Sequence, residues 1–511
     1  MFPNNARSGA SLATVALLCC VALAARAGEK TGVSADLLVE QDYDSNIFGQ
    51  PTNEQGSPIT IVRPALHLEN TGTLGSAHLD GWISSHTFWQ ESTLDGVDRG
   101  VSGDLDRTIF PRLSVFASGS YQRLAAHAEI RGPDVITISE TPGVPSEPVI
   151  SPGQLIEGDV PNVDLGQGQL GVRYLLTPRS KLSVSGGPYS VDYLSNQIGR
   201  ADLRDRFGWF GSVALEHNLS ALDSVSLELG ADSTDFANAL LAEVPINDPF
   251  DPHTAELNTG AVTSDQQSVS LGWTRSWSEL WKTSVSVGGR RLHTKTKDAS
   301  QQVTRVGPTA SGGDSLGLAQ FTDFVPASFD DVGPGWIGAL SIERVLPRGV
   351  AALSYSRETR TTSSLASSNV DVDTISASYV HHLSARVELT LLGSFEHYVS
   401  ANNSPSVVGA TYTPDSFNPI TGPEFTCASG TLVEIGSGAS KAGQCEIGNK
   451  QTFSSNLWYA SARLDWQLRK HLSTFVALRF VDRKGDVQLF GNPYNKFNVG
   501  LGFRYDYDFG F

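Results

Sequence analysis

The chain has 511 residues and a formal net charge of −17, with 37 Lys and Arg residues against 54 Asp and Glu residues. Because this acidic chain carries no basic patch, we expect no nucleic-acid partner. Its 50 Gly residues, 9% aromatic residues, 18% charged residues and single Met argue against several helix-rich soluble domains and favour strands.

The first segment has the features of a secretory signal peptide. Arg7 precedes a small and apolar run over 10–24, and the residues A-R-A at 25–27 form an A-x-A cleavage site. We therefore expect residues 1–27 to be the signal peptide and residues 28–511 to form a single domain. No later run of about 18 apolar residues occurs, so the sequence predicts no transmembrane helix.

The rest of the chain alternates apolar and polar residues with the period of two that β-strands show. In 497–511 the odd positions are all apolar or aromatic, and the even positions are polar or Gly. Such a stretch can cross a bilayer while tilted, which needs about 9–11 residues. The pattern predicts about 18 strands (16–20), near residues 32–45, 58–70, 75–91, 98–109, 112–123, 165–176, 181–195, 203–218, 223–236, 264–277, 281–296, 335–346, 349–361, 370–383, 385–399, 455–468, 471–484 and 495–511.

The connections between these strands alternate in length. Short turns, such as those at 110–112 and 346–349, alternate with long segments rich in Pro, Gly and Asp. We expect long loops at about 124–164, 237–263, 297–333 and 400–454. Short periplasmic turns and long extracellular loops are typical of bacterial outer-membrane barrels. The predicted fold is therefore all-β, a closed antiparallel transmembrane β-barrel in the outer membrane of a Gram-negative cell.

Both ends of the predicted barrel carry motifs that resemble those of known outer-membrane proteins. Tyr505-x-Tyr507-x-Phe509-x-Phe511 resembles the β-signal that such barrels present to the barrel assembly machinery. Residues 42–48, DYDSNIF, are similar to the Y-D-[SD]-N-[IV]-[FY] opening of a family of outer-membrane β-barrel porins. Members of that family often belong to exopolysaccharide synthesis and export systems. The resemblance therefore implies a secreted polysaccharide as the transported material, and it carries no catalytic residues over.

The acidic opening stretch partly matches a calcium-binding loop. Asp42, Asp44 and Asn46 match the first three ligand positions of an EF-hand. Ile47 stands where the loop needs Gly, and Asn53 stands where it needs the bidentate Glu. We therefore expect no EF-hand here.

A pore-lining role fits this stretch better. Glu40, Asp42 and Asp44 would share the inner face of the first strand, and a barrel closes by pairing its first and last strands. We expect Arg504 to be the cation beside this acidic row; solvated polar residues with no special role are the open alternative. The candidate pore-lining residues are Glu40, Asp42, Asp44, Asn46, Arg463, Asp465, Arg479, Arg504, Asp506 and Asp508, with Arg173, Glu228 and Asp232 as further lumenal charges.

Few other side chains are arranged for catalysis or for ligand recognition. His86 beside Ser84 and Ser85 is the one arrangement of note, and the sequence contains no H-E-x-x-H. We therefore expect no enzyme activity, no cofactor and no metal. Trp and Tyr residues near strand ends favour aromatic girdles, whereas Tyr459 lies on a polar face and is a candidate for sugar contact.

The two remaining cysteines, Cys427 and Cys445, form an even pair in an exported chain, which predicts a disulfide between them. The preferred function is an outer-membrane channel, either the passage or an accessory of an exopolysaccharide export system. The alternative is a general or small-solute diffusion porin. Expected partners are outer-membrane lipid and lipopolysaccharide, the barrel assembly machinery and, for export, periplasmic polysaccharide export components. The oligomeric state is left open.

Overall fold

The structure is a computed structural model of the chain. The residues that it describes are 30–47, 54–125, 163–193, 205–237, 240–246, 253–258, 261–309, 317–361, 369–402, 406–409, 411–412, 425–426, 431–435, 442–447, 451–485 and 493–509.

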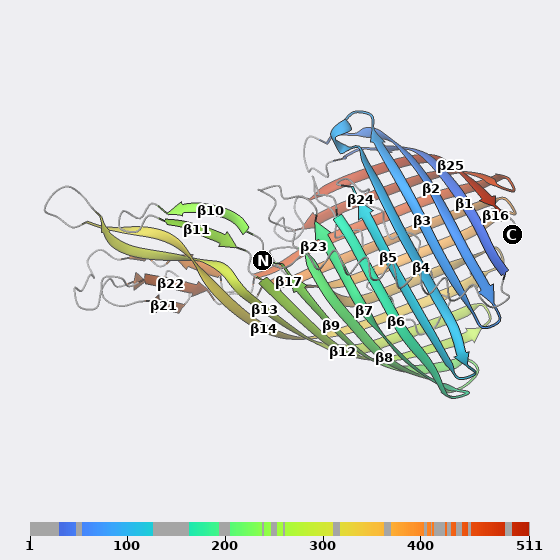
Figure 1. The fold of residues 1–511 in the computed structure, drawn as a ribbon, viewed down its shortest axis with the longest axis horizontal. Coiled ribbons are helices and arrows are strands. Elements are labelled where there is room, and N and C mark those ends of the chain that lie inside the picture. The colour runs from blue at the N-terminus through green and yellow to red at the C-terminus, as the bar shows by residue number, and fades with distance from the viewer. Residues whose placement is uncertain are drawn as a thin grey trace.

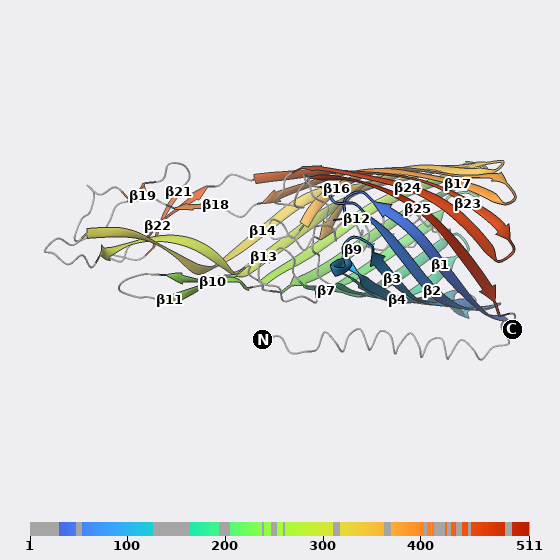
Figure 2. The same cartoon turned by 90° about the horizontal axis from the view of Figure 1, so that it is seen from above.

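Eighteen strands form a closed antiparallel barrel, in which β1 pairs with β2 on one side and with β25 on the other (Figures 1 and 2). The predicted fold class is confirmed, and so is the strand count. The barrel strands are β1 (Lys30–Asp44), β2 (Ser57–Gly72), β3 (Gly75–Phe88), β4 (Gly96–Phe110), β5 (Leu113–Leu124), β6 (Val163–Thr177), β7 (Ser180–Tyr193), β8 (Arg206–Asn218), β9 (Asp223–Phe236), β12 (Ala261–Ser278), β13 (Trp281–Thr309), β14 (Gly317–Leu346), β15 (Gly349–Thr361), β16 (Asn369–Ser384), β17 (Val387–Asn402), β23 (Gln451–Arg469), β24 (Leu472–Gly485) and β25 (Tyr494–Asp508).

The two ends of the barrel differ in their connections. At one end, tight turns such as 73–74 and 347–348 join consecutive strands, and we call this the short-turn end. β1 starts and β25 ends there as well, as Figure 1 shows. The other, which we call the long-connection end, carries the longer connections, including 125–162 and 403–450. The bounds of consecutive strands therefore confirm the predicted alternation of short and long connections.

The outer face of the barrel is a continuous band of exposed apolar side chains. Leu229, Leu271 and Val287 are 51%, 59% and 59% exposed, and their neighbours along each strand point inward. Exposed tryptophans lie near both edges of the band, among them Trp209 and Trp277. Soluble monomers rarely expose so large a contiguous apolar surface, whereas a lipid-facing barrel requires one. Among the described residues, no helix is long and apolar enough to cross a membrane, a finding that does not concern strands.

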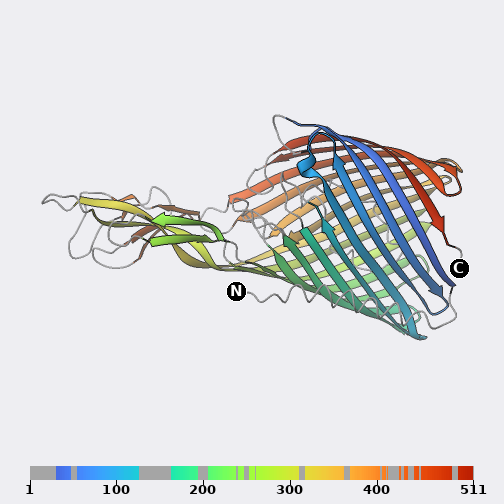
Figure 3. The ribbon, with the colours of Figure 1, turned by 45° about the horizontal axis from the view of Figure 1, so that its top comes forward.

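β13 and β14 continue past the barrel as a long two-stranded arm (Figures 1 and 3). Their ladder runs from Trp281↔Arg344 to Thr309↔Gly317, with one irregularity along it. The expectation of a loop over 297–333 was therefore wrong, because strand-forming Val, Thr and Phe residues alternate there between the Pro and Gly residues.

Short strands also occur inside the other expected loops, at 237–263 and 400–454. They are β10 (Leu240–Ile246), β11 (His253–Asn258), β18 (Ser406–Gly409), β19 (Thr411–Tyr412), β20 (Phe425–Thr426), β21 (Thr431–Ile435) and β22 (Ala442–Ile447). β22 pairs with β13, β18 and β21.

A small apolar cluster fills part of the barrel interior at the long-connection end. Ile59, Ile61 and Phe88 point inward from β2 and β3, and Ile47 and Leu94 pack against them from the connections. Leu94 belongs to the single-turn 3-10 helix η1 (Ser92–Leu94). These contacts hold the connections near the first strands against the inner wall.

Candidate functional site

The acidic row of the opening stretch lies on the inner face of β1. The side chains of Glu40, Asp42 and Asp44 are only 7%, 0% and 2% exposed, and Asn46 is buried just beyond them. Tyr43, one residue from Asp42, points outward and is 47% exposed. The carboxylates on the inner face are therefore covered by other side chains rather than exposed to water in a wide lumen.

Two cations from neighbouring strands pair with this row. Nη2 of Arg479 lies 3.2 Å from Oε1 of Glu40, and its Nη1 lies 3.0 Å from Oδ2 of Asp42. Nζ of Lys496 forms an ion pair with Asp44. These five residues join β1, β24 and β25 where the barrel closes, and we call them the closure seam. Burial of carboxylates is tolerated here because each has a charged partner.

A glycine in β25 lets the carboxylates reach Arg479 on the strand beyond it. Gly500 lies opposite Asp42 in the β1–β25 ladder. A Cβ atom at Gly500 would overlap Oδ1 of Asp42 and lie 2.6 Å from Oε1 of Glu40. The carboxylates therefore occupy the space that a side chain at 500 would fill.

The prediction that Arg504 is the cation of the row was wrong. Register places Arg504 opposite Leu38, nearer the short-turn end. Its guanidinium instead contacts Asp36 at 3.1 Å and Asp506 at 2.9 Å, and it is 47% exposed. The alternation of residues predicts the face on which Arg504 lies, but not the offset between the first and last strands.

The other predicted lumenal charges are spread around the wall rather than gathered in one ring. Arg463 and Asp465 pair along β23 at 2.8 Å. Arg173 on β6 pairs with Asp106 and lies over the Phe116 ring. On β9, Glu228 and Asp232 share the inner face, and Tyr189 donates to Asp232 at 3.2 Å. Asp508 lies opposite Ser34 at the short-turn end.

Tyr459 does not offer a free ring to a sugar. It is 9% exposed and packs with Val481 and Tyr494 inside the wall. Side chains of neighbouring strands pack against the ring, so sugar contact at this residue stays a prediction with little exposed ring to support it.

Part of the remaining inner face carries neutral hydroxyl and amide groups. Gln169 donates to Ser185 at 3.3 Å, Ser185 contacts Ser212 at 3.1 Å, and Ser354 contacts Ser376 at 2.6 Å. We call this surface the neutral arc, and its members are Ser118, Gln169, Ser183, Ser185, Ser212, Ser264, Ser354, Ser376 and Ser394. Sequence reasoning that looked for charges missed it, although Ser at alternate positions was the available signal.

His86 lies in a buried cluster on the inner face of β3. The Ser84 hydroxyl and the Asp98 carboxylate both contact its Nε2, at 3.1 Å and 3.0 Å. A Ser-His-Asp triad requires the carboxylate on Nδ1 and the hydroxyl on Nε2, so this cluster lacks triad geometry. Asp98 also accepts a hydrogen bond from the Ala125 amide at 2.6 Å. The cluster ties β3 and β4 to the start of the next connection.

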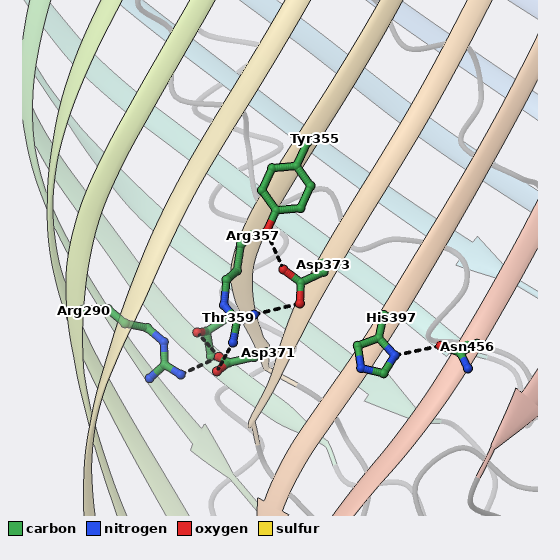
Figure 4. Close-up of polar contacts among 8 residues, drawn as sticks. All are labelled: Arg290, Tyr355, Arg357, Thr359, Asp371, Asp373, His397 and Asn456. Carbon is green, nitrogen blue, oxygen red and sulfur yellow. Dashed lines mark hydrogen bonds and ion pairs between the residues drawn. The ribbon is translucent and has the colours of Figure 1, made fainter.

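A second charged network lies where β14 leaves the wall (Figure 4). The β14–β15 ladder ends at Arg357. This guanidinium donates to Asp373 at 2.8 Å, and Tyr355 donates to the same carboxylate at 2.7 Å. Asp371 pairs with Arg290 of β13 and with Arg357. The network joins β13, β15 and β16 where backbone pairing is interrupted. In the described part of the chain, no group of three or more His, Cys, Asp and Glu side chains is placed to hold a metal ion.

Some predicted features lie outside the described residues, namely the signal peptide at 1–27, Cys427 and Phe511. The disulfide and the complete assembly signal therefore stay predictions. Tyr505 and Tyr507 of that signal both point outward and are 48% exposed.

Together, the closed wall, the exposed apolar outer band and the polar interior define a barrel of the membrane-spanning class. No protein-family model and no curated protein sequence matches the chain. Among solved structures, it is similar to the siderophore receptor PirA from Acinetobacter baumannii (TM-score 0.43, 10% identity, covering 94% of this chain and 81% of that one). It is also similar to OccK2 (OpdF) from Pseudomonas aeruginosa (TM-score 0.40, 10% identity, 94% and 98%). A third similar structure is the ferric-catecholate import receptor Fiu from E. coli K12 (TM-score 0.39, 9% identity, 94% and 82%).

Proposed function

We propose that the chain is an outer-membrane channel, and that it serves as the passage or an accessory of an exopolysaccharide export system. The membrane location is supported by the exposed apolar band and its tryptophans, which would be costly in water. A closed barrel also pairs most backbone groups of the wall within the sheet, without water, as a bilayer demands.

The neutral arc is the observation that supports a polysaccharide as the transported material. Hydroxyl and amide side chains such as Ser185, Ser212 and Gln169 can exchange hydrogen bonds with sugar hydroxyls. The acidic side chains of the closure seam are already paired with cations. An uncharged polyhydroxylated chain would therefore form hydrogen bonds with the neutral arc without being held there by fixed charge.

The alternative is a diffusion porin that takes no part in polysaccharide secretion. The scattered paired charges of the inner wall, such as Arg173 with Asp106, would serve small solutes equally well. The two functions share the channel and differ in what crosses it.

Two measurements separate these functions. In the first, a deletion strain is complemented with the wild-type chain, and secreted hexose is compared with hexose retained in the periplasm. Export predicts that deletion shifts polysaccharide from the medium to the periplasm and that complementation reverses the shift. In the second, the purified barrel is placed in planar bilayers and single-channel conductance is recorded. Normal secretion by the deletion strain together with stable conductance would support the diffusion porin. Absence of conductance under both polarities would contradict the channel itself.

A further inference from the structure

A groove is hollowed into the outer face of the barrel. It lies on β8, β9, β12 and β13, which are neighbours in the sheet. Its volume is about 520 Å³. The proposed channel has no use for this groove, because the side chains that line most of it point away from the lumen.

The strand register arranges the groove as two rows of side chains. The row nearer the long-connection end is Trp209, Ser233, Asp265 and His293, each opposite the next in the ladders. The adjacent row is Gly211, Ala231, Gln267 and Arg291. Gly211 and Ala231 make the floor low because they carry almost no side chain. The indole of Trp209 and the guanidinium of Arg291 stand at opposite sides of it.

The groove lies at the edge of the apolar band that is nearer the long-connection end. The next row toward the short-turn end contains Val213, Leu229 and Val269, which are 39%, 51% and 46% exposed. Beyond it, Leu271 and Val287 are both 59% exposed. The outer face therefore changes from aliphatic to polar at the groove, as it must where acyl chains meet lipid headgroups.

The side chains of the groove favour an anionic, sugar-containing ligand. Arg291 is exposed and forms no ion pair with any described residue, and a guanidinium in such a position binds phosphate oxygens through paired N–H groups. The Asp265 carboxylate accepts a hydrogen bond from Ser233 at 2.6 Å. Trp209 makes an edge-to-face contact with Phe207, at 5.6 Å between ring centroids, which fixes the exposed indole.

We infer that this groove binds the phosphorylated sugar headgroup of a glycolipid in the outer leaflet. Its phosphate lies on Arg291, its sugar ring packs against Trp209, and its acyl chains run over Leu229 and Leu271. A free sugar phosphate would leave the aliphatic rows exposed, so the continuity of the groove with those rows selects a lipid. The inference rests on the proposed membrane location and does not depend on the transported material.

The test is native mass spectrometry of the full chain released from detergent micelles after incubation with a bis-phosphorylated glucosamine-disaccharide lipid. The wild-type chain is expected to retain one lipid, and Arg291→Gln to bind it about tenfold more weakly, as expected for loss of one charge-assisted contact. Ala231→Phe, which fills the floor without removing charge, is expected to weaken binding by a similar factor. Arg99→Gln is the matched control, because Arg99 is also exposed on the outer face, on the distant strand β4.

The lipid is varied to define the headgroup chemistry. The dephosphorylated form of the same lipid is expected to lose the difference between wild type and Arg291→Gln. Equal retention by Arg291→Gln and Arg99→Gln, or equal retention of phosphatidylglycerol, would overturn the inference. Single-channel conductance in pure phospholipid bilayers is recorded in parallel and is expected to be the same for wild type and Arg291→Gln. If the chain binds the lipid but does not conduct, the inference about the groove still holds and only the proposed channel is contradicted.

Discussion

Replacing Arg479 by Gln should destabilise the barrel at its closure. Arg479 is the cation shared by Glu40 and Asp42, whose side chains are 7% and 0% exposed. Removing one partner of a buried ion pair costs about 3–5 kcal/mol, because the other charge stays buried. Arg479 is itself 23% exposed, so we expect the lower end, about 3 kcal/mol, which is roughly a hundredfold change in the folding equilibrium.

The assay is denaturant unfolding of the barrel in lipid vesicles, followed by tryptophan fluorescence. Glu40→Gln and Asp42→Asn, added to Arg479→Gln, should restore most of the lost stability because no unpaired charge then remains. Arg504→Gln is the control, since its half-exposed ion pairs are worth at most about 1 kcal/mol. A loss below 1 kcal/mol for Arg479→Gln, or no rescue by the neutral carboxylates, would refute the reasoning.

Three further predictions concern other parts of the wall. Gly500→Val should cost about 1–3 kcal/mol, because its side chain would enter the space of the seam carboxylates; an unchanged denaturation midpoint would contradict this. Leu271→Arg should cost about 2–4 kcal/mol on the lipid face, whereas Ser270→Arg, on the inner face of the same strand, should change conductance more than stability. Under non-reducing conditions, Cys427 and Cys445 should resist alkylation; a mass shift from alkylation without prior reduction would exclude the bridge.

The alternation of side chains along single strands made most of the barrel predictable. The strict period over 497–511 predicts which residues of β25 face out, and the exposures of Phe497, Leu501 and Phe503 agree. The arm of β13 and β14 was missed because its Pro and Gly residues are turn signals in most contexts. Pairing along this arm continues through Pro308↔Leu318 and Gly307↔Ala319, so backbone hydrogen bonds outweigh the local preference.

The partners of the inner-face charges could not be read from the sequence. Arg479 lies 439 residues from Glu40, and both belong to strands that meet only when the barrel closes. Which cation faces a given carboxylate depends on the stagger of the whole sheet, and a slip of one residue would send Arg479 to the lipid face. Gly500 offered no signal either, because its importance lies in the atoms that a neighbouring strand places beside it.

The closure seam also bears on when the wall becomes complete. β1 and β25 lie at opposite ends of the barrel sequence. Pairing them therefore costs more chain entropy than pairing two strands of one hairpin. The ion pairs of Arg479 and Lys496 lie along this last ladder and connect three strands rather than two. These ion pairs stabilise the closed barrel only in the native register, because Asp42 reaches Arg479 only when Gly500 lies opposite Asp42. A seam of this kind therefore selects one stagger of the barrel, and the stagger in turn determines which side chains face each other across the neutral arc.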